Sequence, residues 1–238
     1  MKVLAIIPAR GGSKSLPRKN VLPVAGKPLI AHSIEHAKGA NSVGRTIVST
    51  EDSEIASIAL SCGAEVIHRP LELADDTTSS EAALLHSLKY LDKTEQFRPD
   101  LVVFLQCTSP IRESHDIDQA VKLLLNENAD SLLSACRSHA FLWHRNGGNV
   151  DSLNYDYRER RRRQDMPAEF IENGSMYVFK PWVLEKLNNR LGGKIVLFEM
   201  DYWSSFQIDS REEFELCEWI LNRRKANRDK PILEGRIS

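Results

Sequence analysis

Short, largely apolar runs alternate with segments that carry apolar residues at helical spacing. The runs at 3–7, 45–50, 65–67, 100–106 and 131–136 predict strands, and those at 3–7 and 100–106 have the unbroken apolar character of strands buried in a parallel sheet. Between them, the spacing and the capping residues predict helices over 28–38, 52–62, 79–91 and 116–125. This alternation predicts an α/β fold with a doubly wound, mainly parallel, Rossmann-like sheet.

The segment 137–170 breaks this alternation. It is polar, and Gly147-Gly148-Asn149 within it predicts a hairpin turn. A strand at 174–179, a short helix from Pro181, a strand at 194–199 and a helix over 212–228 follow. A long irregular segment in a compact domain is usually functional or part of an interface. We therefore expect one domain, 1–238, from which 137–170, called the arm below, projects.

Composition narrows the class of protein. With 238 residues, 42% hydrophobic and 27% charged, the chain suits one globular domain. A formal net charge of -1 argues against a nucleic-acid binder, and no apolar segment is long enough to span a bilayer, so no membrane partner is expected. The scattered cysteines predict reduced, mostly buried thiols in a cytoplasmic protein, at Cys62, Cys107, Cys136 and Cys217.

The first strand runs directly into a cationic, glycine-containing loop at 8–20. Gly11 and Gly12 lack the side chains that would keep a ligand off the backbone, so successive N–H groups can face one anion. Neither a Walker A motif nor a dinucleotide-binding G-x-G-x-x-G pattern occurs. The alternative is a solvated connection between a strand and a helix. We favour a polyphosphate site, because the loop adds four cations: Arg10, Lys14, Arg18 and Lys19.

The loop P-A-R-G-G-S-K-S-L-P-R-K-N, followed by V-A-G-K-P-L-I, resembles the signature of the acylneuraminate cytidylyltransferases. Enzymes of that family transfer CMP from CTP to the anomeric 2-hydroxyl of a nine-carbon keto-acid sugar and release pyrophosphate. The resemblance implies a nucleotidyltransferase variant of the Rossmann-like fold and a homodimer in which the arm completes the neighbour's sugar site. It also implies that the triphosphate lies on the loop, against Arg10, Gly11, Gly12, Ser13, Lys14 and Lys19.

Two further segments resemble nucleoside-binding motifs of the same family. In H-R-P-L-E-L-A-D-D-T-T-S-S the residues matching the family are Arg69, Thr78 and Ser80, whereas Ser79 is expected to cap the following helix. The second segment, L-Q-C-T-S-P-I-R, ends a buried strand, where α/β sheets hold ligands. Arg112 in it is either a surface charge or a ligand contact. The resemblance implies that the nucleoside contacts Asn20, Arg69, Thr78, Ser80 and Gln106.

The basic run at 158–163 has more than one interpretation. As a charge run alone it favours a solvated or nucleic-acid-facing patch, or a localisation signal. Together with E-N-G-S-M-Y, R-R-Q-D resembles the family's sugar-binding segment. A sugar carboxylate and the negative charge that develops on the transferred phosphate both favour a pair of arginines. The resemblance implies catalytic roles for Arg162 and Arg163 with Lys19, and sugar contacts from Gln106, Arg163, Gln164, Asn173 and Tyr177.

The last matching segment departs from the family. Family members commonly carry D-I-D after the final strand, but here the residues are Gln207-Ile208-Asp209. Asp209 keeps the position that would hold the cofactor Mg²⁺, which would lower the pKa of the attacking hydroxyl. Gln207 is a weak magnesium ligand and cannot act as a general base. The substitution leaves open which group accepts the nucleophile's proton.

Four alternatives remain. A cytidylyltransferase for the eight-carbon acid Kdo has a similar loop, although Lys14 and Lys19-Asn20 fit the sialic acid group better. A glycosyltransferase that consumes a nucleotide sugar is the alternative from another class; such enzymes usually carry a D-x-D metal motif midway along the chain, and the spacing alone is met by Asp116-Ile117-Asp118. A non-catalytic nucleotide-binding homologue is favoured only by Gln207. Finally, His32-Ser-Ile-Glu-His36 has the spacing of a zinc site, but the sequence offers no third ligand.

Overall fold

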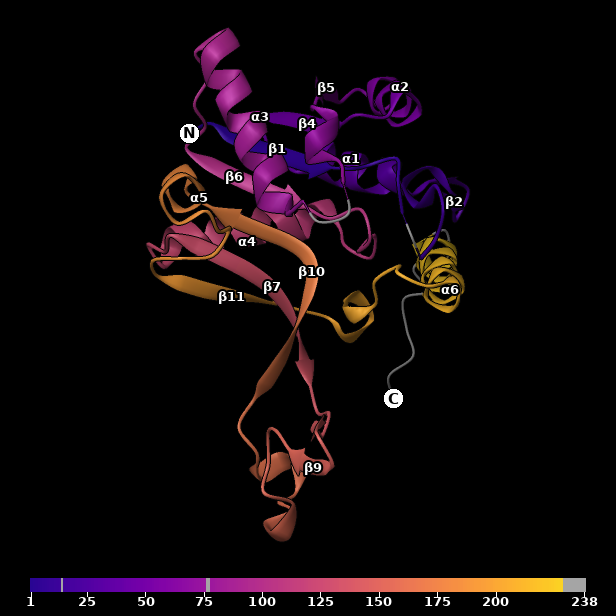
Figure 1. Ribbon diagram of the computed structural model, residues 1–238, viewed down its shortest axis with the longest axis vertical. Coiled ribbons are helices and arrows are strands. Elements are labelled where there is room, and N and C mark those ends of the chain that lie inside the picture. The colour runs from indigo at the N-terminus through magenta and orange to yellow at the C-terminus, as the bar shows by residue number, and fades with distance from the viewer. Residues whose placement is uncertain (14, 76–77, 229–238) are drawn as a thin grey trace, which may run out of the picture.

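A computed structural model describes residues 1–13, 15–75 and 78–228. Its centre is a seven-stranded sheet with the order β11-β7-β10-β6-β1-β4-β5 (Figure 1). Within it, β10 runs antiparallel to β6 and β7, and the other neighbouring strands are parallel. The predicted mainly parallel α/β sheet is confirmed. Its strands are β1 (Val3–Pro8), β4 (Arg45–Thr50), β5 (Glu65–His68), β6 (Leu101–Leu105), β7 (Ser131–Ser138), β10 (Glu169–Phe179) and β11 (Ile195–Met200).

Helices cover both faces of the sheet. Successive side chains of β1 point to opposite faces, so Val3, Ala5 and Ile7 pack in one core, whereas Leu4 and Ile6 pack in the other. The first core is covered by α1 (Leu29–Gly39), α2 (Ser53–Ser61), α4 (Ser114–Asn126) and α6 (Arg211–Arg228), and the second by α3 (Ser80–Glu95) and α5 (Pro181–Leu187).

In the described ranges no helix combines the length and the apolar character needed to cross a membrane.

Local signals in the sequence place most helix starts correctly. The Asp52 carboxylate accepts a hydrogen bond from the Ile55 N–H at 2.9 Å, and the Ser79 hydroxyl accepts one from the Ala82 N–H at 3.3 Å. Pro181 occupies the first turn of α5. α3 continues to Glu95, four residues beyond the predicted end. Cys107, Cys136 and Cys217 are buried free thiols, in agreement with the prediction of mostly buried thiols, whereas Cys62 is partly exposed.

The arm extends away from the sheet (Figure 1). It begins where β7 and β10 continue as a two-stranded ribbon, and its tip carries a hairpin of β8 (Trp143–Asn146) and β9 (Asn149–Ser152), whose turn contains the predicted glycines. β10 starts five residues before the predicted strand, because its first residues lie on the exposed ribbon and lack an apolar pattern. Large exposed apolar side chains gather on the arm and at its end: Leu142, Trp143, Val150, Leu153, Tyr157 and Phe170 on the arm, and Ile171 directly after it.

Short elements complete the chain. A two-stranded ribbon of β2 (Pro23–Val24) and β3 (Lys27–Pro28) leads into α1. The remaining elements are 3₁₀ turns, at Lys19–Val21, Leu71–Leu73, Tyr157–Glu159, Arg163–Asp165 and Tyr202–Ser205.

Candidate functional site

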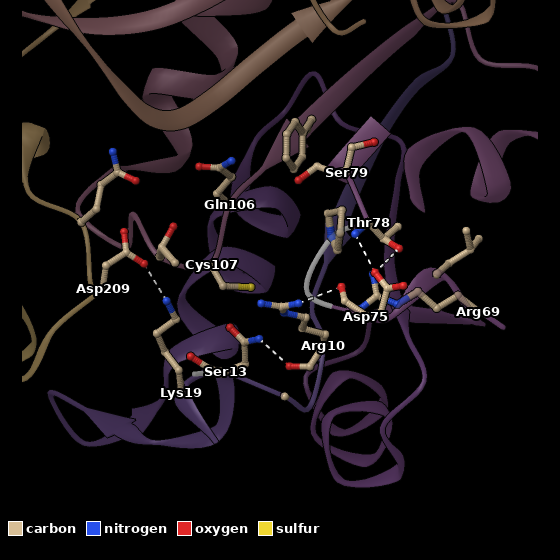
Figure 2. A pocket seen from close by; sticks show the side chains of 18 residues that line it. Arg10, Ser13, Lys19, Arg69, Asp75, Thr78, Ser79, Gln106, Cys107 and Asp209 are labelled. Atoms are coloured by element: carbon tan, nitrogen blue, oxygen red, sulfur yellow. Dashed lines mark hydrogen bonds and ion pairs between the residues drawn. The ribbon is translucent and has the colours of Figure 1, made fainter. Parts of the chain in front are cut away.

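A cavity of about 420 Å³, called the main cavity below, opens at the carboxyl ends of β1 and β6 (Figure 2). This is the edge of an α/β sheet where ligands bind. The N-terminus of α3 also contributes, through Ser79 and Ser80, and helix N-termini favour anions. Many of the residues predicted for the site line this cavity: Arg10, Gly12, Ser13, Lys19, Asn20, Arg69, Thr78, Ser80, Gln106 and Asp209.

Lys19 joins the loop to the segment after the last strand. Its Nζ donates to the Asp209 carboxylate at 2.7 Å and to the Ile208 carbonyl at 2.9 Å, and the residue is 8% exposed (Figure 2). The backbone at Arg18 has a φ of 59°, in the left-handed region. Chain reversal at Arg18 therefore places the Lys19 side chain at the cavity.

Arg18 itself is absent from the described lining of the main cavity. Its guanidinium pairs with the carboxylates of Asp52 and Glu54, at the start of α2. The hydrogen bond to Asp52 raises the pKa of Arg18 and lowers that of Asp52. The expectation that Arg18 surrounds the anion is thus wrong, because Arg18 fastens the loop to α2 instead.

The two glycines of the loop differ in environment. The Gly11 N–H donates to Glu51 Oε1 at 2.7 Å, so this amide is already occupied within the chain. A Cβ on Gly11 would collide with the Asp52 carboxylate, which is why the position requires glycine. Gly12 lines the main cavity, and a Cβ there would meet nothing within 4 Å. Lys14 lies outside the described residues.

Arg69 is held rigidly at the cavity wall. It is 8% exposed, and its Nε and Nη2 donate to Glu51 Oε2 at 3.0 and 2.9 Å. A buried guanidinium needs such a partner, because the charged form is costly to remove from water. Glu51 was not identified from the sequence. Its position directly after a predicted strand was the available signal.

Asp75 organises the loop between β5 and α3. Its carbonyl accepts from Arg10 Nη1 at 2.8 Å, and its Oδ1 accepts from the Thr78 N–H at 2.7 Å and the Thr78 hydroxyl at 2.6 Å (Figure 2). Asn20 Nδ2 in turn donates to the Arg10 carbonyl at 2.9 Å. The loop that carries Arg10 and the loop that carries Thr78 are therefore connected across the main cavity. Asp75, too, was missed from sequence.

Two amide side chains meet beside a bulge in β10. Gly174 has a φ of 60°, and the pairing of β10 with β7 shifts register around it. A Cβ there would collide with Gln106 Oε1 and would lie 3.1 Å from Gln207 Oε1. Both glutamines line the main cavity. The neutral amide of Gln207 is therefore part of the site.

Arg112 is neither a surface charge nor a described lining residue of the main cavity, so both expectations for it are wrong. It is 1% exposed, and its guanidinium donates to the Gln106 carbonyl at 3.0 Å, to the Ser175 carbonyl and to the Ser33 hydroxyl. Burial lowers the pKa of Arg112 to about 10. Arg112 therefore holds the backbone of Gln106, a residue that lines the main cavity.

Two residues predicted for the sugar site lie behind the main cavity. Asn173 is fully buried: its Nδ2 donates to the Ser204 carbonyl at 3.0 Å, and its Oδ1 accepts from the Ser134 hydroxyl at 2.7 Å. Tyr177 stacks on Phe104, a lining residue, with a centroid distance of 5.4 Å. Burial and the hydrogen bond to Glu172 raise the pKa of Tyr177 above its usual range. Neither side chain reaches the cavity surface.

The remaining predicted residues lie on the arm. Arg163 and Gln164 line a separate cavity of about 450 Å³, together with Arg137 and Glu169. Arg162 precedes the 3₁₀ turn that contains Arg163. Within one chain, the structure does not bring these three residues to the main cavity.

Two further residues were singled out from sequence. His32, in the zinc-like pattern, lies on the buried side of α1, and its Nε2 is 2.9 Å from the Val24 carbonyl, so a backbone hydrogen bond accounts for this ring nitrogen. Cys107 lies at the main cavity, where burial raises the pKa of its thiol to about 12. Such a thiol is protonated at neutral pH and is a poor nucleophile.

Comparison with known sequences gives consistent matches. The sequence model of a family described as cytidylyltransferase matches residues 4–215. The chain is 34% identical over 234 residues to N-acylneuraminate cytidylyltransferase A of Danio rerio, covering 96% of this chain and 53% of that protein. It is 35% identical to the N-acylneuraminate cytidylyltransferase of Escherichia coli, covering 96% and 54%. It therefore spans about half the length of these curated relatives.

Two other matches add detail. The pseudaminic acid cytidylyltransferase of Campylobacter jejuni is 34% identical over 191 residues, which cover 78% of this chain and 82% of that protein. Among solved structures, CMP:2-keto-3-deoxy-manno-octonic acid synthetase complexed with CTP superposes with a TM-score of 0.70 at 19% identity, covering 94% of this chain and 100% of the other. At that identity the similarity shows the fold alone.

Proposed function

Because the chain belongs to the cytidylyltransferase family, whose sequence model spans residues 4–215, we propose that it transfers CMP from CTP to the anomeric 2-hydroxyl of an N-acylneuraminate or a related nonulosonate, releasing pyrophosphate. The observation that carries the proposal is the main cavity, where a cationic loop, a helix N-terminus and two amide side chains converge at the carboxyl edge of the sheet. The relatives named for N-acylneuraminate and pseudaminic acid support the class of acceptor.

The nucleotide is proposed to lie along the main cavity. Its triphosphate binds beside Arg10, Ser13 and Lys19, with Gly12 allowing close approach and Lys14 belonging to the same loop. The N-terminus of α3 adds oriented N–H groups for the phosphates. The nucleoside is proposed to contact other residues that line the same cavity: Asn20, Arg69, Thr78, Ser80 and Gln106.

The chemical step is proposed to be in-line attack of the sugar hydroxyl on the α-phosphorus of CTP. The new bond is P–O to the sugar, the bond to the pyrophosphate oxygen breaks, and the proton of the sugar hydroxyl is released to water. Lys19, already aimed at the cavity, stabilises negative charge on the transferred phosphate. Gln106 and Gln207 lie together beside Gly174 and are suited to orient the acceptor through neutral hydrogen bonds.

Asp209 is the residue proposed to hold Mg²⁺. Its side chain is 61% exposed at the cavity and presents a hard carboxylate oxygen, and the neighbouring donors, Gln106, Gln207 and Thr108, also offer oxygen. This donor set fits Mg²⁺, which keeps several waters and uses one or two carboxylates together with substrate phosphates. When bound, the ion neutralises phosphate charge and lowers the pKa of a coordinated hydroxyl.

The acceptor site is proposed to be completed by the arm of a second copy in a homodimer. The exposed apolar side chains on the arm, such as Trp143 and Phe170, support an interface there. Arg162, Arg163 and Gln164 would then contact the sugar carboxylate and the reacting phosphate of the partner site. Asn173 and Tyr177 would act indirectly, by fixing the bulge in β10 and the ring of Phe104.

The function is tested by pyrophosphate release from purified protein with CTP and Mg²⁺. The acceptor panel contains N-acetylneuraminate, legionaminate, pseudaminate and Kdo, and UTP and ATP serve as control nucleotides. Turnover with CTP and one nonulosonate is the expected result, and it identifies the substrate. Turnover with Kdo alone would contradict the proposed acceptor class. CTP binding without turnover on any acid would favour a nucleotide-binding homologue.

The arm is tested with Arg163→Ala, which should abolish turnover and leave CTP affinity nearly unchanged. Arg158→Ala is the matched control, because that side chain is 72% exposed and lies in the same basic run. Mixing Arg163→Ala with inactive Lys19→Ala should restore activity, since each mixed dimer contains one site with an intact loop and an intact arm. Random exchange predicts about a quarter of wild-type activity. No recovery on mixing would refute a shared site.

A further inference from the structure

Glu51 contacts both halves of the proposed nucleotide site. It follows β4 directly, and its side chain is 12% exposed. One carboxylate oxygen, Oε1, accepts the Gly11 N–H of the loop at 2.7 Å. The other, Oε2, accepts both Nε and Nη2 of Arg69, at 3.0 and 2.9 Å. A single carboxylate thus joins the triphosphate loop to the arginine at the nucleoside end.

The environment makes this carboxylate difficult to replace. The Arg69 side chain is 5% exposed, so its charge is compensated mainly inside the protein. Two hydrogen bonds to one oxygen fix the plane of the guanidinium and therefore the direction of its remaining N–H donors. At the other oxygen, the Gly11 bond fixes the first turn of the loop.

Glu51 itself is not one of the described residues that line the main cavity, whereas Arg69 is. It therefore acts through its partners rather than on the ligand. Neighbouring Asp52 has a different task, because it caps α2 and pairs with Arg18. Two consecutive acidic residues after β4 thus fasten the two ends of the same loop, Glu51 at Gly11 and Asp52 at Arg18.

We propose that Glu51 is a positioning residue that couples the triphosphate loop to Arg69, so that the phosphates and the base of one nucleotide are bound cooperatively. The inference rests on the proposed CTP site. It assigns to Glu51 a role in affinity and base selectivity, without contact to the nucleotide. Loss of the Glu51 charge should weaken binding of both the triphosphate and the base, and it should reduce the preference for CTP over UTP.

The test measures binding of CTP, UTP and inorganic tripolyphosphate to the full chain by calorimetry. Glu51→Gln keeps the shape and removes the charge, so CTP affinity should fall about ten- to a hundredfold, as expected for loss of hydrogen bonds to a charged group. Tripolyphosphate binding reports on the loop alone, so its affinity should fall less than that of CTP. The ratio of CTP affinity to UTP affinity should approach one. Glu51→Asp retains the charge and should recover part of the CTP affinity.

Glu65→Gln is the matched control. Glu65 also makes a two-bond pair with an arginine, Arg45, between the neighbouring strands β4 and β5, at 2.9 and 2.5 Å. It lies at the start of β5, whereas Arg69 follows the end of that strand. This variant should keep wild-type CTP affinity.

The outcomes separate the two proposals. Wild-type CTP affinity in Glu51→Gln, even with a lowered melting temperature, would overturn the positioning role alone. An equal loss for CTP, UTP and tripolyphosphate would also overturn it, because Arg69 would not be involved. CTP binding by the wild type without pyrophosphate release would overturn the proposed function alone. Absence of CTP binding by the wild type would overturn both.

Discussion

Replacing Arg112 with Met is expected to destabilise the protein by about 2–4 kcal/mol. The guanidinium connects Gln106, which directly follows β6, with β10 and α1, through the Gln106 carbonyl, the Ser175 carbonyl and the Ser33 hydroxyl. Methionine fills a similar space and donates no hydrogen bond.

The magnitude follows from the groups that lose their donor. The buried carbonyl of Ser175 and the partly buried carbonyl of Gln106 each lose a bond to a charged group worth about 1.5–3 kcal/mol, which sums to at most about 3–6 kcal/mol. Removing a buried cation offsets part of this cost, because the charge no longer has to be desolvated. The net value is a large part of the roughly 5–15 kcal/mol that stabilises a typical domain.

Urea unfolding monitored by tryptophan fluorescence measures the change. At about 2–4 °C per kcal/mol for a chain of this size, the melting temperature should fall by about 4–16 °C. Arg98→Met is the control: that side chain is 80% exposed and pairs with Asp92, so its loss should leave the free energy of unfolding nearly unchanged. A change of less than 0.5 kcal/mol in Arg112→Met would refute the reasoning, since the carbonyls would then be satisfied without the arginine.

Two further changes test the site and its support. Gly174→Ala should reduce both stability and the proposed turnover, because φ is 60° at this position and the new Cβ would collide with the Gln106 amide. Gly148→Ala is the control and should reduce neither, because open space surrounds that position. Equal activity of the two variants would contradict this view of the bulge. Burial lowers the pKa of His32 from 6.5, so the unfolded state binds more protons below that pH and unfolding free energy should fall as pH decreases from about 6.5. Urea titrations between pH 5 and 7.5 should show a weaker dependence in His32→Asn, and an unchanged slope would exclude His32 as the group responsible.

Local features of the sequence were sufficient for the elements of the fold. Apolar runs predict the strands, and Asp52, Ser79 and Pro181 mark helix starts, because capping and strand burial depend on a few adjacent residues. The location of the loop at the end of the first strand also follows from order along the chain. The family resemblance added the residues that line the cavity, including Arg69 and Gln106.

The pairing of distant side chains was decided only by the tertiary structure. Lys19 and Asp209 meet because β1 and the segment after β11 end at the same edge of the sheet, 190 residues apart in sequence. The position of a charged residue along the chain does not reveal its partner, so Arg18 and Arg112 look alike in sequence. In the structure Arg18 pairs with Asp52 and fixes a loop, whereas Arg112 is fully buried. The sequence alone determined the alternation of elements and the chemistry available to the site. Strand order and packing determined which of those groups face a ligand and which, like Glu51, hold the others in place, because side-chain contacts depend on how the elements assemble.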